Sequence, residues 1–83
     1  MSTIETTIQA MRIEAIDEVC SRSRVMDSLL DLRLVAESRA DVTSVIDSAL
    51  ADLPGKTMVP GSWYRERLDM IELAAVHPAE PVG

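Results

Sequence analysis

Hydrophobic side chains recur at helical spacing through the first half of the chain. From Met1 to Leu53 the sequence contains neither Gly nor Pro, the residues that most often interrupt helices. The apolar positions in this stretch lie three or four residues apart, which is the repeat of an amphipathic helix. They occupy two positions of one heptad register: Ile4, Met11, Val25 and Leu32, and Ile8, Ala15, Leu29 and Ala36. The pattern predicts an all-α fold without a sheet.

The register is interrupted by two polar residues in the middle, Glu18 and Arg22. The interruption allows two interpretations. Either one helix of about 35 residues carries a polar layer at its centre, or the chain turns near residues 20–24 into a helical hairpin. Ser21 or Ser23 would then cap the second helix. Because helices in globular proteins average about 11 to 12 residues, we favour the hairpin.

Two more helices are predicted in the second half of the chain. Asp41 is the expected N-cap of the first, which we expect to stop at Pro54-Gly55, with Gly55 supplying a left-handed cap. Its apolar face comprises Val42, Val45, Ile46, Ala49, Leu50 and Leu53. Ser62 is the expected N-cap of the last helix. Its predicted main face is Trp63, Met70, Ile71 and Ala74, with Tyr64, Leu68 and Ala75 beside it.

The whole chain is long enough for one modest core. We predict a single helical domain over residues 1–76, a small bundle of three to four helices, followed by a flexible tail over residues 77–83. The formal net charge is −6, with 8 basic and 14 acidic residues, which disfavours binding to phosphate backbones and anionic membranes. The sequence contains neither a membrane-spanning apolar run nor a signal-peptide pattern.

A cytoplasmic location is expected, since the single cysteine fits a reducing compartment. Seven of the eight basic residues are Arg, and together with abundant Asp, Ala and Val this composition favours a bacterial or phage source.

No group of residues indicates catalysis. Gly55-Lys56-Thr57 resembles the end of a phosphate-binding loop, but Leu50 stands where the motif requires its first Gly, and a helix precedes it rather than a strand. A nucleophilic Cys20 would need a histidine base, and His77 is the single candidate, at the expected end of the last helix. We therefore expect no enzymatic activity, no cofactor and no metal site.

The function is instead expected at the surface, because the first two helical segments carry more apolar surface than two short helices cover. The leading hypothesis is a non-enzymatic protein–protein interaction module: a small acidic regulator, adaptor or inhibitor that binds a protein partner and forms a homodimer. The candidate interface residues are Ile13, Ile16, Met26, Leu30, Trp63 and Tyr64. Whether the two aromatic residues belong to the core or to an interface is left open.

Two other function classes are kept as alternatives. One is a DNA-associated regulator, either a helix-turn-helix-like reader or an acidic DNA mimic. The other is a non-catalytic subunit of an enzyme. The reader is disfavoured because the last two helices are joined by about eight residues, twice the usual tight turn, and because the last helix carries Glu66, Asp69 and Glu72 against only Arg65 and Arg67.

Overall fold

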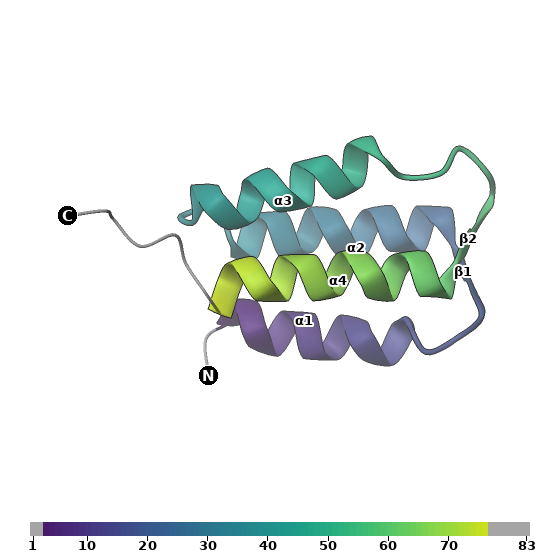
Figure 1. The fold of residues 1–83 in the computed structure, drawn as a ribbon, viewed down its shortest axis with the longest axis horizontal. Coiled ribbons are helices and arrows are strands. Elements are labelled where there is room, and N and C mark those ends of the chain that lie inside the picture. Colours follow the sequence, from purple (N-terminus) through teal and green to yellow (C-terminus); the bar gives the residue numbers. More distant parts are fainter. Residues whose placement is uncertain (1–2, 77–83) are drawn as a thin grey trace.

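Four helices run along one common axis and form an up-down-up-down bundle in the computed structural model, which describes residues 3–76 (Figure 1). They are α1 (Thr3–Glu14), α2 (Arg22–Val35), α3 (Ala40–Ala51) and α4 (Gly61–Val76). Each helix packs against two neighbours, in the order α1, α2, α3, α4 and back to α1. The predicted small helical bundle is confirmed. The predicted flexible tail lies outside the described residues.

The first half of the chain is a helical hairpin and not one long helix. Helix α1 ends at Glu14, and α2 begins at Arg22 after a connection over residues 15–21. The two polar residues that interrupt the heptad register lie at this connection. All eight apolar positions of the register are buried: Ile4, Ile8, Met11, Ala15, Val25, Leu29, Leu32 and Ala36.

A short antiparallel ladder joins the two connections at one end of the bundle. Strand β1 (Val19–Ser21) pairs with β2 (Met58–Pro60), and Cys20 lies opposite Val59 at the centre. The prediction of no sheet is therefore wrong in this detail. Because neighbouring strand residues face opposite sides, Cys20 is buried and Val19 is 53% exposed.

The ladder also sets where two helices begin. Ser21 occupies the N-cap position of α2 without a side-chain capping bond, and the Arg22 N–H donates to the Thr57 carbonyl at 2.9 Å. Helix α4 starts at Gly61, one residue before the cap predicted at Ser62, and the Gly61 N–H donates to the Glu18 carbonyl at 2.6 Å. A Cβ at position 61 would overlap the carbonyl oxygen of Asp17, so this close approach requires Gly.

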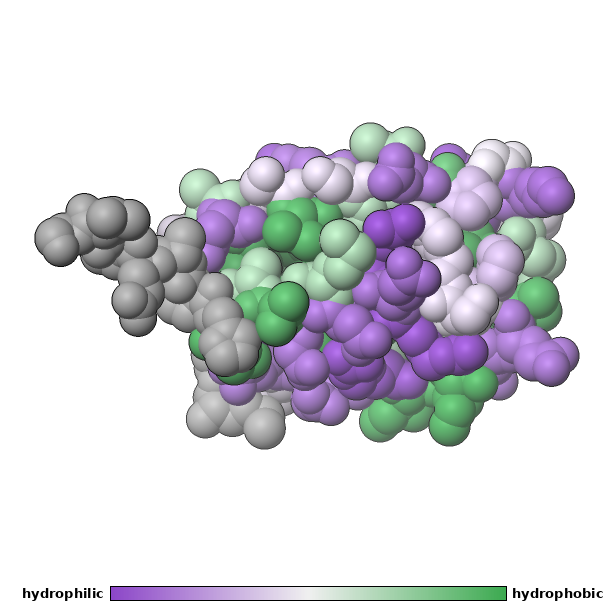
Figure 2. Space-filling model, in the orientation of Figure 1, coloured by the Kyte–Doolittle hydropathy of each residue, from purple (hydrophilic) through white to green (hydrophobic). Residues whose placement is uncertain are grey.

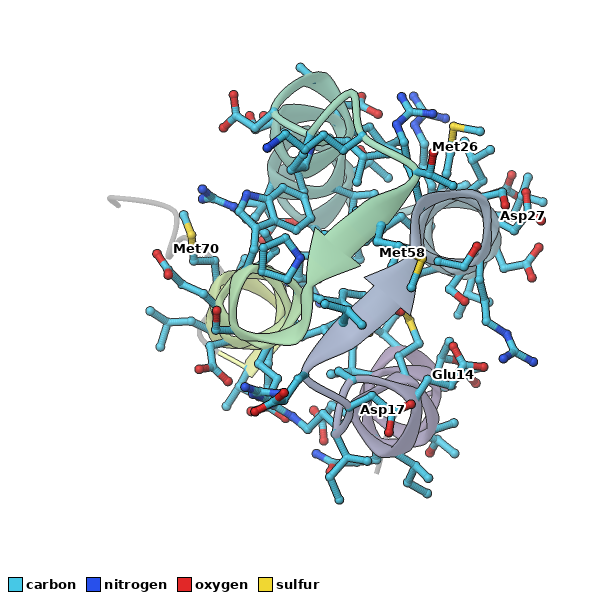
Figure 3. All side chains as sticks on the ribbon, turned by 90° about the vertical axis from the view of Figure 1, so that its right-hand side faces the viewer. Glu14, Asp17, Met26, Asp27, Met58 and Met70 are labelled. Atoms are coloured by element: carbon cyan, nitrogen blue, oxygen red, sulfur yellow. The ribbon has the colours of Figure 1, made fainter. Side chains whose placement is uncertain are left out.

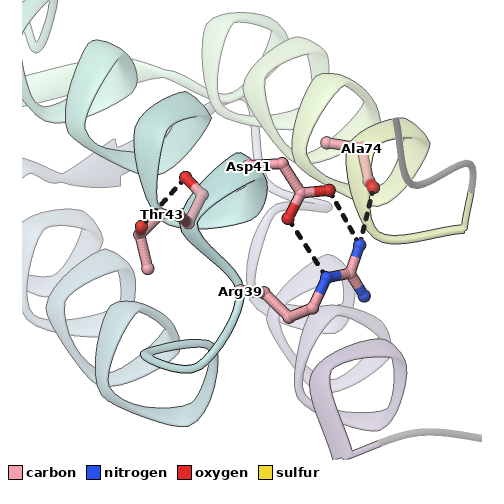
Figure 4. A network of polar contacts seen from close by, with 5 residues as sticks. Arg39, Asp41, Thr43 and Ala74 are labelled. Atoms are coloured by element: carbon pink, nitrogen blue, oxygen red, sulfur yellow. Dashed lines mark hydrogen bonds and ion pairs between the residues drawn. The ribbon is translucent and has the colours of Figure 1, made fainter. Parts of the chain in front are cut away.

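Helix α3 begins earlier than predicted, with Arg39 at its N-cap position and Asp41 in the first turn. The Arg39 Nε and Nη2 atoms donate to the two Asp41 carboxylate oxygens at 3.1 and 2.9 Å (Figure 4). Nη2 also donates to the Ala74 carbonyl at 3.3 Å. Arg39 therefore ties the start of α3 to the last turns of α4.

The end of α3 also differs from the prediction. The helix stops at Ala51, and its C-cap is Asp52, three residues before Gly55. None of the glycines in the described part of the chain has a positive φ, so the predicted left-handed Gly55 cap is absent.

The buried face of α4 combines the strip that the sequence assigned to its flank with Ile71 of the predicted main face. Its fully or nearly buried side chains are Tyr64, Leu68, Ile71 and Ala75. Trp63 and Ala74 are half-buried, and Met70 is 48% exposed. Both strips of α4 are apolar, so periodicity alone did not distinguish them. On α3 the predicted face is correct: Val42, Ile46, Ala49 and Leu53 are buried, and Val45 and Leu50 pack against them.

Candidate functional site

The two most exposed large apolar side chains within residues 3–76 lie at the end of the bundle that holds the ladder. Ile13 is 75% exposed and Ile16 is 77% exposed, at the end of α1 and in the turn after it. Val19 follows on the outer face of β1, and Met58, 46% exposed, lies on the same face of the ladder in β2. Figure 2 shows apolar atoms gathered at the lower right, over this end of α1. We call these four residues the apolar end patch.

Carboxylates surround the apolar end patch. Glu14, Asp17 and Glu18 are the sequence neighbours of its three residues from α1 and β1, and all three are exposed. Of the basic side chains at this end, Arg12 is paired with Asp69 and Glu72, and Arg65 Nη1 donates to the carbonyls of Ala15 at 2.6 Å and Asp17 at 3.3 Å. The Arg65 guanidinium is thus held against the backbone of the turn. The rim of the patch is acidic.

Nearly all arginines are engaged within the molecule, which bears on nucleic-acid binding. In the part of the chain that the structure describes, every arginine except Arg24 makes a hydrogen bond, an ion pair or a ring contact. Arg12, Arg33 and Arg39 form ion pairs, Arg22 and Arg65 donate to backbone carbonyls, and Arg67 lies 5.3 Å from the Trp63 ring centre. Helices α3 and α4 also lie along one axis rather than crossing as in a helix-turn-helix (Figure 1). Neither observation favours a DNA reader.

The structure separates the predicted interface residues. Ile13 and Ile16 belong to the apolar end patch. Met26 is half-buried on the side of α2 that faces α3, whereas Glu14 and Asp17 lie beside α1, on the opposite side of α2 (Figure 3). Leu30, 44% exposed, lies one helical turn from Met26. The four aliphatic residues therefore do not form one surface.

The two aromatic residues also differ in position. Trp63 is half-buried against Arg67 at the surface, whereas Tyr64 is 1% exposed and belongs to the core. Sequence reasoning missed Val19 and Met58 as surface residues because it predicted no strands.

A cavity of about 180 Å³ adjoins the apolar end patch. It lies between the end of α1, strand β1, the start of α2 and one side chain of α4. The residues that line it are Glu14, Asp17, Val19, Cys20, Ser21, Arg24, Val25 and Tyr64. Val19 belongs to both the cavity and the patch, and two of the rim carboxylates, Glu14 and Asp17, line the cavity as well.

Tyr64 brings a buried hydroxyl to this cavity. The hydroxyl oxygen has no hydrogen-bond partner within hydrogen-bond geometry, although Ser28 lies close enough to lower its pKa, the second influence after burial. The Ser28 hydroxyl itself donates to Glu14 Oε2 at 3.1 Å. Burial is the main influence and raises the pKa of Tyr64 to about 12. The side chain is therefore a neutral phenol at neutral pH.

The Cys20 thiol is held in its neutral form. It is buried, donates weakly to the Glu14 carbonyl at 3.8 Å, and has a pKa raised by burial and by the nearby Asp17 carboxylate. A thiol in this state is a poor nucleophile and a poor metal ligand.

Metal binding has no support in residues 3–76, where no three His, Cys, Asp or Glu side chains come together. The same residues include no helix that is long and apolar enough to span a bilayer.

Comparisons with known proteins identify no relative of this chain. A scan against family models, a search of curated proteins and a search of solved structures each found no match to the chain.

Proposed function

We propose that this protein is a non-enzymatic protein–protein interaction module that binds its partner through the apolar end patch. The observation that carries the proposal is the exposure of Ile13 and Ile16, at 75% and 77%, next to the exposed face of the ladder. Exposed apolar side chains gathered at one end of a small protein are typical of an interaction site. The free thiol of Cys20 fits action in the reducing cytoplasm.

The acidic rim indicates what kind of partner fits. Charged groups around an apolar interface centre steer association and select partners of opposite charge. With Glu14, Asp17 and Glu18 around the patch and a net charge of −6, the complementary surface is apolar at its centre and carries Lys or Arg at its edge. A cationic amphipathic protein segment meets both requirements.

The homodimer expected from the sequence stays a prediction. The carboxylates around the patch disfavour it. A two-fold dimer through the apolar end patch brings identical surfaces face to face, so the three rim carboxylates of each copy would approach those of the other. Light scattering on a sizing column decides the point. If the protein is a dimer at micromolar concentration and Ile16→Glu converts it to a monomer, the partner of the patch is a second copy of the chain and not a basic segment.

Selection from a displayed library of random peptides tests the proposal and requires no identified partner. The immobilised wild-type protein selects peptides, which are then depleted on the double variant Ile13→Glu, Ile16→Glu. Both positions are highly exposed, so the variant should keep the fold. We expect enriched peptides that combine apolar residues with Lys or Arg.

The matched control places the same substitution elsewhere. Leu34→Glu changes a side chain that is 67% exposed on α2 and outside the patch, so it should leave binding of the selected peptides unchanged. Enrichment that survives depletion on the double variant, or that favours acidic peptides, would contradict the proposal.

A further inference from the structure

We infer that the cavity beside the apolar end patch receives the ammonium group of a lysine side chain of the bound partner, an inference that rests on the proposed function. The cavity opens next to Val19, so a residue of a segment lying on the patch reaches it directly. A buried side chain inserted in a pocket at the edge of an apolar contact is a common form of interface anchor.

Two side chains that line the cavity, Tyr64 and Asp17, carry oxygen atoms without a hydrogen-bond partner in the described chain. The Tyr64 hydroxyl, on a side chain 1% exposed, has no partner. A buried polar group left unpaired is unfavourable, so a ligand that pairs with it gains binding energy. The Asp17 carboxylate makes no hydrogen bond or ion pair to any residue of the described chain. An ammonium group carries three donors and fits such a set of oxygen atoms.

The charges that face the cavity favour a cation. Glu14 and Asp17 line it and outnumber the one lining cation, Arg24; all three residues are exposed. Burial is the main cause of the raised pKa values of Tyr64 and Cys20, and Glu14 adds to both. Asp17 also raises the pKa of Cys20, by more than Arg65 lowers it. An anionic ligand would meet this field unfavourably.

The size and walls of the cavity fit lysine. At about 30 Å³ per water molecule, 180 Å³ corresponds to about six waters, enough for an alkyl chain with one small head group. Val19 and Val25 supply apolar wall for the methylene stem, which lysine commonly buries while its ammonium meets polar groups. The planar guanidinium of arginine is bulkier than an ammonium group and fills more of this space.

Titration with n-butylamine, the lysine side chain without its backbone, tests the inference on the protein alone. Chemical shifts of the backbone amides are followed at neutral pH. The comparison ligands, of similar chain length, are n-pentanol, pentanoate and n-butylguanidine. We expect saturable shifts confined to residues around the cavity, with a Kd on the order of 1 mM. The alcohol and the carboxylate should bind at least about five-fold more weakly, and the guanidine more weakly than the amine.

Substitutions in the cavity wall should change the affinity for n-butylamine in opposite directions. Asp17→Asn and Tyr64→Phe should each weaken amine binding by about three- to ten-fold, because each removes a partner of the ammonium. Arg24→Gln should strengthen it by about two- to three-fold, because it removes the one cation that lines the cavity. Asp27→Asn, the same change at an exposed position on the outer side of α2, is the control without effect (Figure 3).

Two results would overturn the inference: no saturable shift with the amine, or an Arg24→Gln variant that binds it less well. Because the titration involves no protein partner, failure here leaves the proposed function standing if selected peptides still depend on Ile13 and Ile16. If n-butylamine binds but the peptide selection fails, the proposed function is wrong. The assignment of a partner lysine then fails with it, and only an amine-binding cavity is left.

Discussion

Tyr64 is the largest fully buried side chain in the bundle, and its hydroxyl is buried without a hydrogen-bond partner. As the single tyrosine of the chain, it gives a clean optical signal. We predict that tyrosinate absorbance of the folded protein rises with a midpoint near pH 12, about two units above the ordinary value. A midpoint near 10 would show that solvent reaches the hydroxyl.

The same residue predicts how stability changes in alkali. The unfolded chain loses the tyrosine proton near pH 10 and the folded chain near pH 12, so the unfolded state binds fewer protons between these values. The free energy of unfolding should therefore be unaffected by this group below pH 10 and fall by about 2 to 3 kcal/mol as the pH rises through 12. Denaturant unfolding of Tyr64→Phe should lack this part of the pH dependence.

Burial on α3 predicts two different costs for similar truncations. Ile46 is fully buried, and Ile46→Ala should lower the free energy of unfolding by about 2 to 5 kcal/mol. Leu50, one turn later, is half-buried, so Leu50→Ala should cost clearly less, about 1 to 2 kcal/mol. Urea unfolding measures both. Equal costs would show that the two positions share the same burial.

At the scale of elements, the ladder between β1 and β2 depends on a glycine. Gly61→Ala would press a methyl group onto the Asp17 carbonyl and should cost about 1 to 3 kcal/mol, or prevent pairing of the strands. Gly55→Ala is the matched control, because a Cβ there meets no atom within 4 Å and the residue has no positive φ. It should be neutral or stabilise by up to about 1 kcal/mol. Equal destabilisation of both variants by urea would contradict this account.

The helices were predictable from the sequence because their buried positions repeat. Ile8, Leu29 and Ile46 each continue a stripe with three- and four-residue spacing, and all three are fully buried. The strands were not predictable, since three residues are too few to show an alternating pattern. Their existence depends on two connections, 15–21 and 52–60, meeting at one end of the bundle, which only the packing of the helices decides.

At the scale of the whole molecule, the candidate site combines predictable and unpredictable parts. Ile13 and Ile16 were predicted as surface residues because they lie off the buried stripe of α1. The cavity was not predictable, because it brings Tyr64 of α4 next to Glu14 and Cys20 at the far end of the sequence. Nor does an apolar pattern on α4 show that Tyr64 rather than Trp63 enters the core.

In the described part of the chain, charges form ion pairs along the helices but not around the apolar end patch. Ion pairs such as Arg12 with Asp69, at 2.7 Å, and Arg33 with Asp47, at 2.6 Å, neutralise charges along the helices. Around the apolar end patch, the carboxylates of Glu14, Asp17 and Glu18 form no ion pair within the described residues. Association with a basic segment should consequently weaken as the salt concentration rises.

Binding of one selected peptide, measured by calorimetry on three proteins, tests the central claim most directly. The account predicts that wild type and Leu34→Glu bind with equal Kd, that Ile16→Glu binds at least about ten-fold more weakly, and that raising the salt concentration weakens wild-type binding. Equal loss of affinity in Ile16→Glu and Leu34→Glu, or full affinity in both, would contradict the assignment of the apolar end patch as the interaction surface.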